Sequence, residues 1–228
     1  MIVLSDGPAR HRLGWRWTRV GSGGASPWYV VDGIEAWAAY VPLDAASQSA
    51  SYADITGNGR DVTVGDTAPD FSASYGWYIN DFGMYLLTPS FPQQADQSQT
   101  MMIQFSDFSE TDSFHVLFGN STENGGFAVC PSFMGMGASF YNGNSTGGSP
   151  NHTSGSMGIA GNKAFRDGVE SHTAIGTYGT PVGGQLAIGA DKWGESACIV
   201  KVQSAVLFDV ALTATQMGTL ESNMPKLS

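Results

Sequence analysis

The chain has 228 residues, with 10 Lys and Arg against 20 Asp and Glu, so its formal net charge is −10. Charged residues make up 13% of the chain, against roughly 25% in ordinary domains, while 30 residues are Gly and 11% are aromatic. This composition excludes a coiled coil, which needs Ala, Glu, Lys and Leu, and a typical disordered tail, which lacks aromatic residues. The acidic balance argues against nucleic-acid binding, because phosphate contacts depend on Lys and Arg.

Two parts of the chain differ in charge. Residues 1–33 hold four Arg against two Asp, a net charge of +2, whereas residues 34–228 hold six basic and eighteen acidic side chains, a net charge of −12. Residues 21–27 have the Gly/Ser-rich composition of a flexible linker. We therefore expect an N-terminal arm and linker over 1–33 and one globular domain over 34–228. No apolar stretch reaches the roughly 18 residues that cross a membrane, so no membrane insertion is expected.

From residue 34 onward, short apolar runs alternate with turn residues. This pattern predicts strands over 36–41, 62–64, 75–79, 84–88, 100–108, 114–118, 126–130, 137–141, 157–160, 163–166, 169–173, 186–189 and 198–209. The segments 75–79 and 84–88 flank a turn at 80–83 and are expected to pair as a hairpin. Asp167-Gly168 predicts a second hairpin, because both residue types accept positive φ. The polar residues 142–156 are expected to form one long exposed loop.

One helix is predicted near the C-terminus. Thr213 and Gln216 match a capping box, Met217 and Leu220 give a short apolar face, and Pro225 ends the pattern. Many short strands with Gly-rich turns, and no repeat at a fixed period, predict an all-β fold: a two-sheet antiparallel sandwich rather than βαβ units.

Three stretches, in this order, resemble the LamG-like, concanavalin A-like jelly-roll superfamily. The first joins residues 39–44 to the turn 54–61, which is similar to the opening strand and the D-x-S-G-N-G-N turn of that family. The second, residues 165–170, resembles its Y-x-D-G-v hairpin. The third resembles its l-x-I-G strand, its last core strand and its closing a-L-s-x-x-q-i helix, at residues 186–190, 202–209 and 211–217. The resemblance implies a LamG-like jelly-roll sandwich over 34–228, with the arm outside it.

This superfamily contains lectins, glycoside hydrolases and protein-binding or structural modules, so the fold does not fix the function. Its hydrolases present paired carboxylates in an E-x-D-x-x-E pattern, one as nucleophile and one as acid. No such triplet occurs in this sequence, and its 4 scattered His are expected to be surface or hydrogen-bonded residues rather than catalytic ones. We therefore expect a non-enzymatic protein without catalytic residues.

No cofactor is expected. Cys130 and Cys198 do not form a C-x-x-C pair and no H-E-x-x-H occurs, so the sequence carries no zinc motif. Each thiol is expected to be buried and free, with one disulfide as the alternative. The resemblance leaves calcium open, because Asp54 and Asn58 bring oxygen ligands to a turn. The alternative is that both are ordinary turn residues.

Sugar binding needs an aromatic surface for the apolar faces of the sugar and amide or carboxylate groups for its hydroxyls. Three loop regions combine these residue types, and the glycan-binding candidates are Trp77, Tyr78, Asn80 and Asp81; Tyr141, Asn142 and Asn144; and Asp191 and Trp193. The alternative for Trp77 and Trp193 is that each packs in the core or caps the edge of the sandwich.

The arm combines aromatic and cationic side chains, which are enriched at protein interfaces. The partner-binding candidates are Arg12, Trp15, Arg16, Trp17, Arg19 and Trp28. A basic arm beside an acidic domain is suited to docking on a neighbouring subunit. The alternative is that the arm folds back as an edge strand of its own sandwich.

Three functions from different classes fit the sequence. The favoured one is a structural or adhesive virion protein of a tailed phage, in a head, tail or fibre, because the fold resembles modules of such particles. Residues 1–8 do not resemble a signal peptide, and assembly in the host followed by lysis would place the protein on the virion surface. Its expected partners are other virion proteins or copies of itself in a homo-oligomer, and cell-surface glycans. The alternatives are a secreted carbohydrate-binding lectin module and, second, a glycoside hydrolase.

Overall fold

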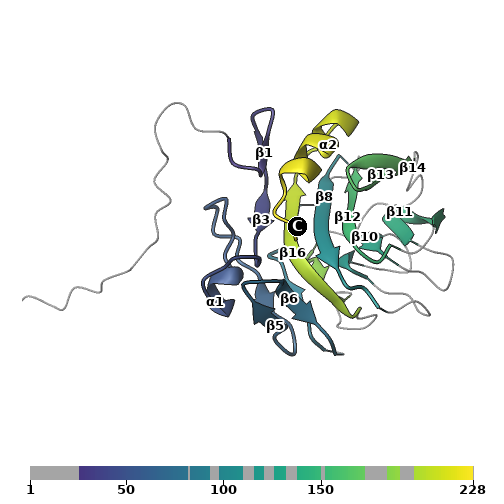
Figure 1. Cartoon of the computed structure of the whole chain (residues 1–228). Coiled ribbons are helices and arrows are strands. Elements are labelled where there is room, and N and C mark those ends of the chain that lie inside the picture. The colour runs from purple at the N-terminus through teal and green to yellow at the C-terminus, as the bar shows by residue number, and fades with distance from the viewer. Residues whose placement is uncertain are drawn as a thin grey trace, which may run out of the picture.

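A computed structural model of the chain describes residues 26–81, 83–92, 98–109, 116–120, 126–131, 138–149, 152–172, 184–190 and 198–227. The described residues form strands and turns with two short helices (Figure 1). The predicted all-β antiparallel sandwich with a short C-terminal helix is confirmed. Neither described helix is long and apolar enough to cross a membrane.

The larger sheet has eight strands. Seven follow one another in the order β14 (Val169–His172), β13 (Lys163–Arg166), β12 (Gly155–Ala160), β8 (Thr100–Ser106), β16 (Val200–Phe208), β6 (Gly76–Ile79) and β5 (Asp70–Ser72), and β3 (Ala38–Tyr40) also pairs with β16. Strand β16 lies between β8 on one side and, on the other, β6 at its start and β3 near its end. It is therefore the strand that holds this sheet together.

The smaller sheet has six strands, in the order β11 (Ala138–Ser149), β10 (Gly126–Cys130), β9 (Phe118–Asn120), β15 (Ala187–Ile188), β7 (Leu86–Leu87) and β4 (Thr63–Val64). A separate hairpin joins β1 (Val30–Val31) to β2 (Ile34–Glu35). Its turn residues Asp32 and Gly33 both have positive φ, 51° and 81°. The predicted boundary between residues 33 and 34 thus falls inside this hairpin.

The main core lies between the two sheets. Alternation along β8 buries Met101, Ile103 and Phe105 in it. The smaller sheet contributes, among others, Phe118 and Phe127, which are also fully buried. Burying one such side chain stabilises the fold by about 1.5–3 kcal/mol, so this interior supplies most of the driving force for closing the sandwich.

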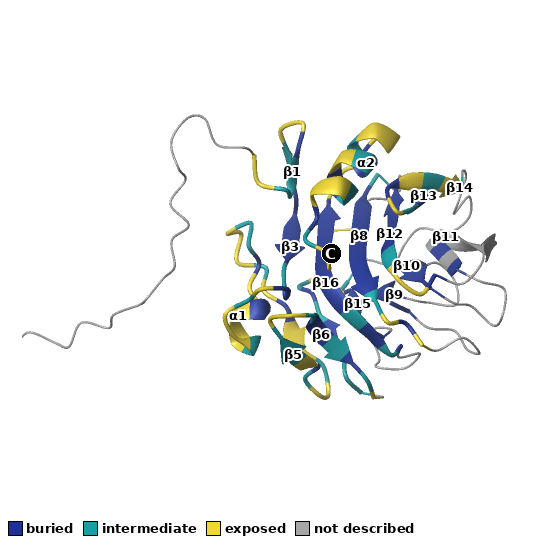
Figure 2. Ribbon diagram, in the orientation of Figure 1, coloured by how far each residue is buried: buried dark blue, intermediate teal, exposed yellow. Residues whose placement is uncertain are grey.

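A second apolar cluster lies on the outward face of the larger sheet, beneath helix α2 (Ala214–Asn223). Met102 and Val206, which point away from the main core, pack there with Met217 and Leu220 of the helix. The view coloured by burial shows α2 over the upper part of this face, with β5 and β6 at the opposite end (Figure 2). The helix therefore covers only part of the outward face.

The helix begins as the sequence predicted. The Thr213 side chain accepts a hydrogen bond from the backbone N–H of Gln216, and the Gln216 side chain accepts one from the backbone N–H of Thr213. The Asp167-Gly168 hairpin is also confirmed, with φ of 49° and 73°. A Cβ atom at Gly168 would lie 2.9 Å from Cβ of Glu221. The glycine therefore lets α2 approach this turn.

Some predictions of strand pairing and of the extent of loops are wrong. Strands β6 and β7 do not form a hairpin, because β6 belongs to the larger sheet and β7 to the smaller one. Trp77, Ile79 and Leu86 bury their side chains in the same core from opposite sheets, and such a pattern looks like a hairpin in the sequence. The predicted loop 142–156 is partly strand, since β11 continues to Ser149 and β12 starts at Gly155. The short helix α1 (Gln48–Ser51) was not expected.

The turn 54–61 covers the free edge of β3. Asp54 Oδ1 accepts hydrogen bonds from the backbone N–H groups of Ala39 and Thr56, both at 3.1 Å, and its Oδ2 accepts one from the N–H of Arg60 at 3.2 Å. An uncovered edge strand would leave such groups unpaired. The carboxylate is buried and already surrounded by donors, so Asp54 is an ordinary turn residue rather than an open calcium ligand.

Replacing Asp54 with Ala should destabilise the fold. The substitution leaves the N–H groups of Ala39, Thr56 and Arg60 without their charged acceptor, and we expect the free energy of unfolding to fall by about 3 kcal/mol. Urea unfolding followed by circular dichroism measures this change. The control, Asp66→Ala at an exposed position, should change stability by less than about 0.5 kcal/mol. Equal midpoints for Asp54→Ala and the unsubstituted protein would contradict the role of this turn.

Candidate functional site

Strand β6 divides its aromatic residues between the two faces of the larger sheet. Successive side chains on a strand point to opposite faces, so Trp77 and Ile79 enter the core while Tyr78 points outward. The Trp77 ring is 0% exposed, and its indole N–H donates to Ser51 Oγ at 2.7 Å. The prediction that Trp77 contacts a glycan is therefore wrong, and the alternative, packing in the core, is confirmed.

The register of the larger sheet brings Tyr78 beside residues that are distant in sequence. Tyr78 lies opposite Asp70 of β5 on one side and Lys201 of β16 on the other. Lys201 in turn lies opposite Ser106, the last residue of β8. Four strands thus contribute one row of polar and aromatic residues across the outward face.

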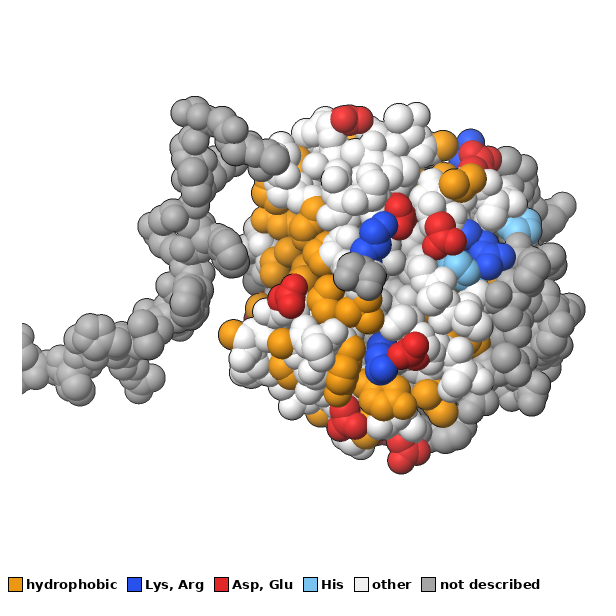
Figure 3. Space-filling view, in the orientation of Figure 1, with side chains coloured by type: hydrophobic (Ala, Val, Ile, Leu, Met, Phe, Trp, Pro, Cys, Tyr) orange, Lys and Arg blue, Asp and Glu red, His pale blue; other side chains and the backbone are white. Residues whose placement is uncertain are grey.

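We call the resulting group the tyrosine patch; its members are Asp70, Tyr75, Tyr78, Asn80, Asp107 and Lys201. The rings of Tyr75 and Tyr78 meet edge to face, with centroids 6.2 Å apart at an angle of 77°. The Lys201 ammonium lies 5.3 Å from the Tyr75 centroid and 5.6 Å from that of Tyr78. In the space-filling view, hydrophobic side chains gather beside a pair of opposite charges over β16 and β6 (Figure 3).

Two polar contacts order the charged members of the patch. Lys201 Nζ lies 2.6 Å from Asp107 Oδ2 at one end, and Asn80 Nδ2 donates to Asp70 Oδ2 at 3.0 Å at the other. The hydrogen bond to Asp107 is the main cause that raises the pKa of Lys201. The ammonium is therefore held in its charged form beside the two rings.

A bulge in β16 supports the patch from below. The pairing of β16 with β8 shifts between Val202 and Ser204, which leaves Gln203 as the extra residue. Gln203 is buried, and its Nε2 donates to Ser106 Oγ at 3.2 Å and to the backbone carbonyl of Tyr75 at 3.4 Å. This amide ties the turn that carries Tyr75 to the centre of the sheet.

The patch offers the chemistry of a sugar-contact surface. Two half-buried tyrosine rings provide apolar area that sugar C–H groups can cover, and Asp70, Asn80 and Asp107 provide acceptors and a donor for hydroxyls. Rings that are already held against a cation lose little freedom when a ligand binds.

Of the other predicted glycan-binding residues, the structure describes the side chain of Asp81 alone. Asp81 directly follows Asn80 and is exposed. Tyr141, Asn142 and Asn144 lie on β11, the edge strand of the smaller sheet, and their side chains lie outside the described part of the chain. Asp191 and Trp193 are also outside the described residues. Trp77 and Tyr78 thus belong to the larger sheet, and the backbone of Tyr141, Asn142 and Asn144 belongs to the smaller one.

The arm candidates are placed only in part. Arg12, Trp15, Arg16, Trp17 and Arg19 lie outside the described residues, so their role stays a prediction. Trp28 is half-buried against the second apolar cluster of its own chain, and its ring meets that of Tyr29 edge to face at 5.9 Å. The described part of the predicted arm therefore packs on the sandwich.

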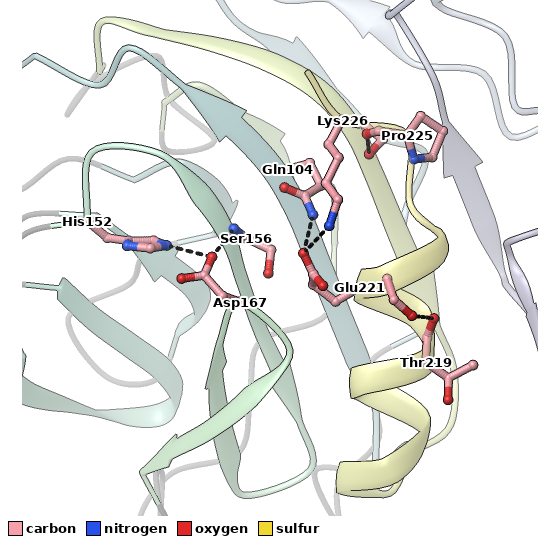
Figure 4. A network of polar contacts seen from close by, with 10 residues as sticks. Gln104, His152, Ser156, Asp167, Thr219, Glu221, Pro225 and Lys226 are labelled. Atoms are coloured by element: carbon pink, nitrogen blue, oxygen red, sulfur yellow. Dashed lines mark hydrogen bonds and ion pairs between the residues drawn. The ribbon is translucent and has the colours of Figure 1, made fainter. Parts of the chain in front are cut away.

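A second polar network lies at His152, just before β12 of the larger sheet. Its Nδ1 lies 2.8 Å from Nη2 of Arg166, and its Nε2 lies 3.4 Å from Oδ1 of Asp167, which also accepts the N–H of Ser156 at 2.9 Å (Figure 4). The imidazole ring packs edge to face against Phe105 at 5.4 Å. Burial is the main cause that lowers the pKa of His152, and the charge of Arg166 acts in the same direction.

Figure 4 also shows Glu221 of α2, whose Oε1 accepts hydrogen bonds from Gln104 and Lys226.

Within the described residues, no three His, Cys, Asp or Glu side chains gather as a metal site. Cys130 and Cys198 are buried free thiols, as predicted, and burial raises the pKa of both. Both thiols are therefore protonated at neutral pH.

Comparison with known proteins gives structural but not sequence relatives. No protein-family model matches the chain, and no curated protein sequence matches it. The binding domain of botulinum neurotoxin serotype D superposes with a TM-score of 0.60 at 10% identity, over 83% of this chain and 52% of that domain structure. Trypanosoma rangeli sialidase in complex with sialic acid gives a TM-score of 0.57 at 13% identity, over 81% of this chain and 32% of the sialidase.

A third similar structure has nearly the same extent as this chain. Domain 4 of AbnA, a GH43 extracellular arabinanase from Geobacillus stearothermophilus, in complex with arabinotriose, gives a TM-score of 0.53 at 15% identity, over 81% of this chain and 99% of that domain. The chain spans about a third of the sialidase and about half of the toxin domain. At these identities the comparisons establish the fold alone: a jelly-roll-type β-sandwich.

Acidification should destabilise the protein through His152. The folded state lowers the pKa of His152 from 6.5, so the unfolded chain binds more protons near this pH. The contribution of His152 to stability is therefore fully present above about pH 6.5 and declines as the pH falls below it. One proton limits the slope to about 1.4 kcal/mol per pH unit. Urea unfolding at several pH values between 7.5 and 5.5 measures it. His152→Gln should flatten this profile, whereas the control His172→Gln should not. Parallel profiles for the unsubstituted protein and His152→Gln would exclude His152 as the cause.

Proposed function

We propose that this chain is a non-catalytic carbohydrate-binding β-sandwich module and that the tyrosine patch contacts the glycan. The observation that carries the proposal is the outward pair Tyr75 and Tyr78, held beside Lys201 and Asp107 by the pairing of β6 with β16. Aromatic rings with neighbouring hydrogen-bonding groups match a ligand that has apolar faces and hydroxyl edges.

The structural neighbours support this proposal through the sugars that they bind. The arabinanase domain was solved with arabinotriose, and a botulinum neurotoxin serotype D binding domain was solved with N-acetylneuraminic acid. Both share the sandwich fold with this chain at 15% and 11% identity. The arabinanase domain is matched over 99% of its length, so the shared fold spans nearly the whole of that domain.

These neighbours favour the lectin interpretation over the virion interpretation. The similarity to the sialidase concerns the fold, and the proposed module does no chemistry on its ligand. A virion role, virion partners, a homo-oligomer and a place on the virion surface remain predictions from the sequence. They are compatible with glycan binding, because an adhesive protein also needs a receptor.

Binding should depend on the ring of Tyr78. A glycan array and isothermal titration calorimetry with the full chain should identify a bound oligosaccharide, and Tyr78→Ala should weaken its binding at least about tenfold, or about 1.4 kcal/mol, because the stacking surface is removed. Tyr78→Phe should retain affinity within about threefold, because the ring remains.

Thermal unfolding of each variant checks that the fold is intact. Val169→Ala serves as a control, since Val169 is 69% exposed and lies on β14 at the other edge of the sheet. A protein that binds no glycan on the array, or one whose binding is the same in Tyr78→Ala, would refute the proposed function.

A further inference from the structure

We infer that the tyrosine patch selects uncharged glycans and rejects glycans that carry a carboxylate. This inference rests on the proposed function of the same patch and adds the chemical class of its ligand. It follows from how the charged groups of the patch are paired and exposed.

The only cation of the patch is already used. Lys201 Nζ lies 2.6 Å from Asp107 Oδ2, and its side chain is 28% exposed, whereas that of Asp107 is 60% exposed. Asp70 adds a second, exposed carboxylate. The patch thus holds two negative charges against one positive charge, and a ligand meets the carboxylates before the ammonium. A sialic acid carboxylate would have no free partner and two repulsive neighbours.

Cations elsewhere on the described residues are also engaged. Each of the other described Lys and Arg side chains has a partner: Arg60 the carbonyl of Trp37, Lys163 the carboxylate of Glu170, Arg166 the ring of His152, and Lys226 the carboxylate of Glu221. The chain as a whole carries a net charge of −10. Within the described part of the chain, no second cation joins the patch, and the net charge does not compensate its local negative potential.

The same carboxylates suit neutral sugars. An ionised carboxylate has about four acceptor positions, and the structure gives Asp70 one hydrogen bond from Asn80 and Asp107 one from Lys201. The remaining acceptor capacity needs donors, and sugar hydroxyls are donors. The patch therefore combines apolar stacking with acceptors for hydroxyl groups, which a neutral oligosaccharide satisfies without bringing a charge.

The test compares matched pairs of oligosaccharides that differ only in a terminal sialic acid. The unsubstituted protein should bind the sialylated member at least about tenfold more weakly than the neutral one. Binding of both members should be lost in Tyr78→Ala. Raising the NaCl concentration from about 0.05 M to about 1 M should narrow this ratio, because salt screens the repulsion.

Asp107→Asn should narrow the ratio of the affinities for the neutral and the sialylated oligosaccharide to less than about threefold. The substitution removes one carboxylate and frees Lys201 for an acidic sugar. Asn fits the backbone at this position, where φ is 56°. The matched control is Asp209→Asn, which removes the same charge just past the other end of β16 and should leave the ratio unchanged. The salt titration of the unsubstituted protein provides a second test that requires no variant.

The outcomes separate this inference from the proposed function. Equal or tighter binding of the sialylated member, lost in Tyr78→Ala, would overturn the inference and leave the proposed function standing. Discrimination that neither salt nor Asp107→Asn reduces would also overturn it, because charge would not be its cause. Failure of every glycan to bind through Tyr78 would reject the proposed function and the inference together.

Discussion

Strand β16 lies at the centre of the larger sheet, and the alternation of its side chains divides the molecule into a core and an outward face. Val200 and Val202 point into the core, so Lys201 between them must point outward. The bulge at Gln203 resets this alternation, so that Val206 meets α2 instead of the core. Strand β16 therefore determines which of its side chains enter the core, which contact α2, and where the only cation of the tyrosine patch lies.

Local signals in the sequence predicted local structure well. The capping box at Thr213, the Asp167-Gly168 hairpin and the bounds of β10 and β13 all depend on residues within a few positions of one another. The hairpin predicted from 75–79 and 84–88 was wrong because which sheet a strand joins depends on long-range pairing. Two segments that bury side chains in one core from opposite sheets carry the same pattern as a hairpin.

In the candidate site, too, residues close in sequence were predicted and residues joined by long-range strand pairing were missed. Tyr78 and Asn80 were predicted because they are close in sequence, whereas Trp77, predicted with them as a glycan contact, packs in the core. Lys201 and Asp107 were missed because only the register of β16 with β6 and β8 brings them to Tyr78. Lys201 is the only charged residue of β16 and lies between two valines, and this was the available signal, since alternation requires it to point outward. The jelly-roll-type sandwich is shared with a sialidase, a toxin domain and an arabinanase domain, so the function depends on the side chains that each protein places on its faces.

We propose that the ligand contacts the outward face of the larger sheet, at the end that α2 leaves uncovered. Backbone amide chemical shifts of the ¹⁵N-labelled full chain, titrated with a bound neutral oligosaccharide, test this directly. We expect the largest changes at Tyr75, Tyr78, Asn80, Asp107 and Lys201. Changes confined to β11 of the smaller sheet, with the amides of the tyrosine patch unmoved, would contradict it.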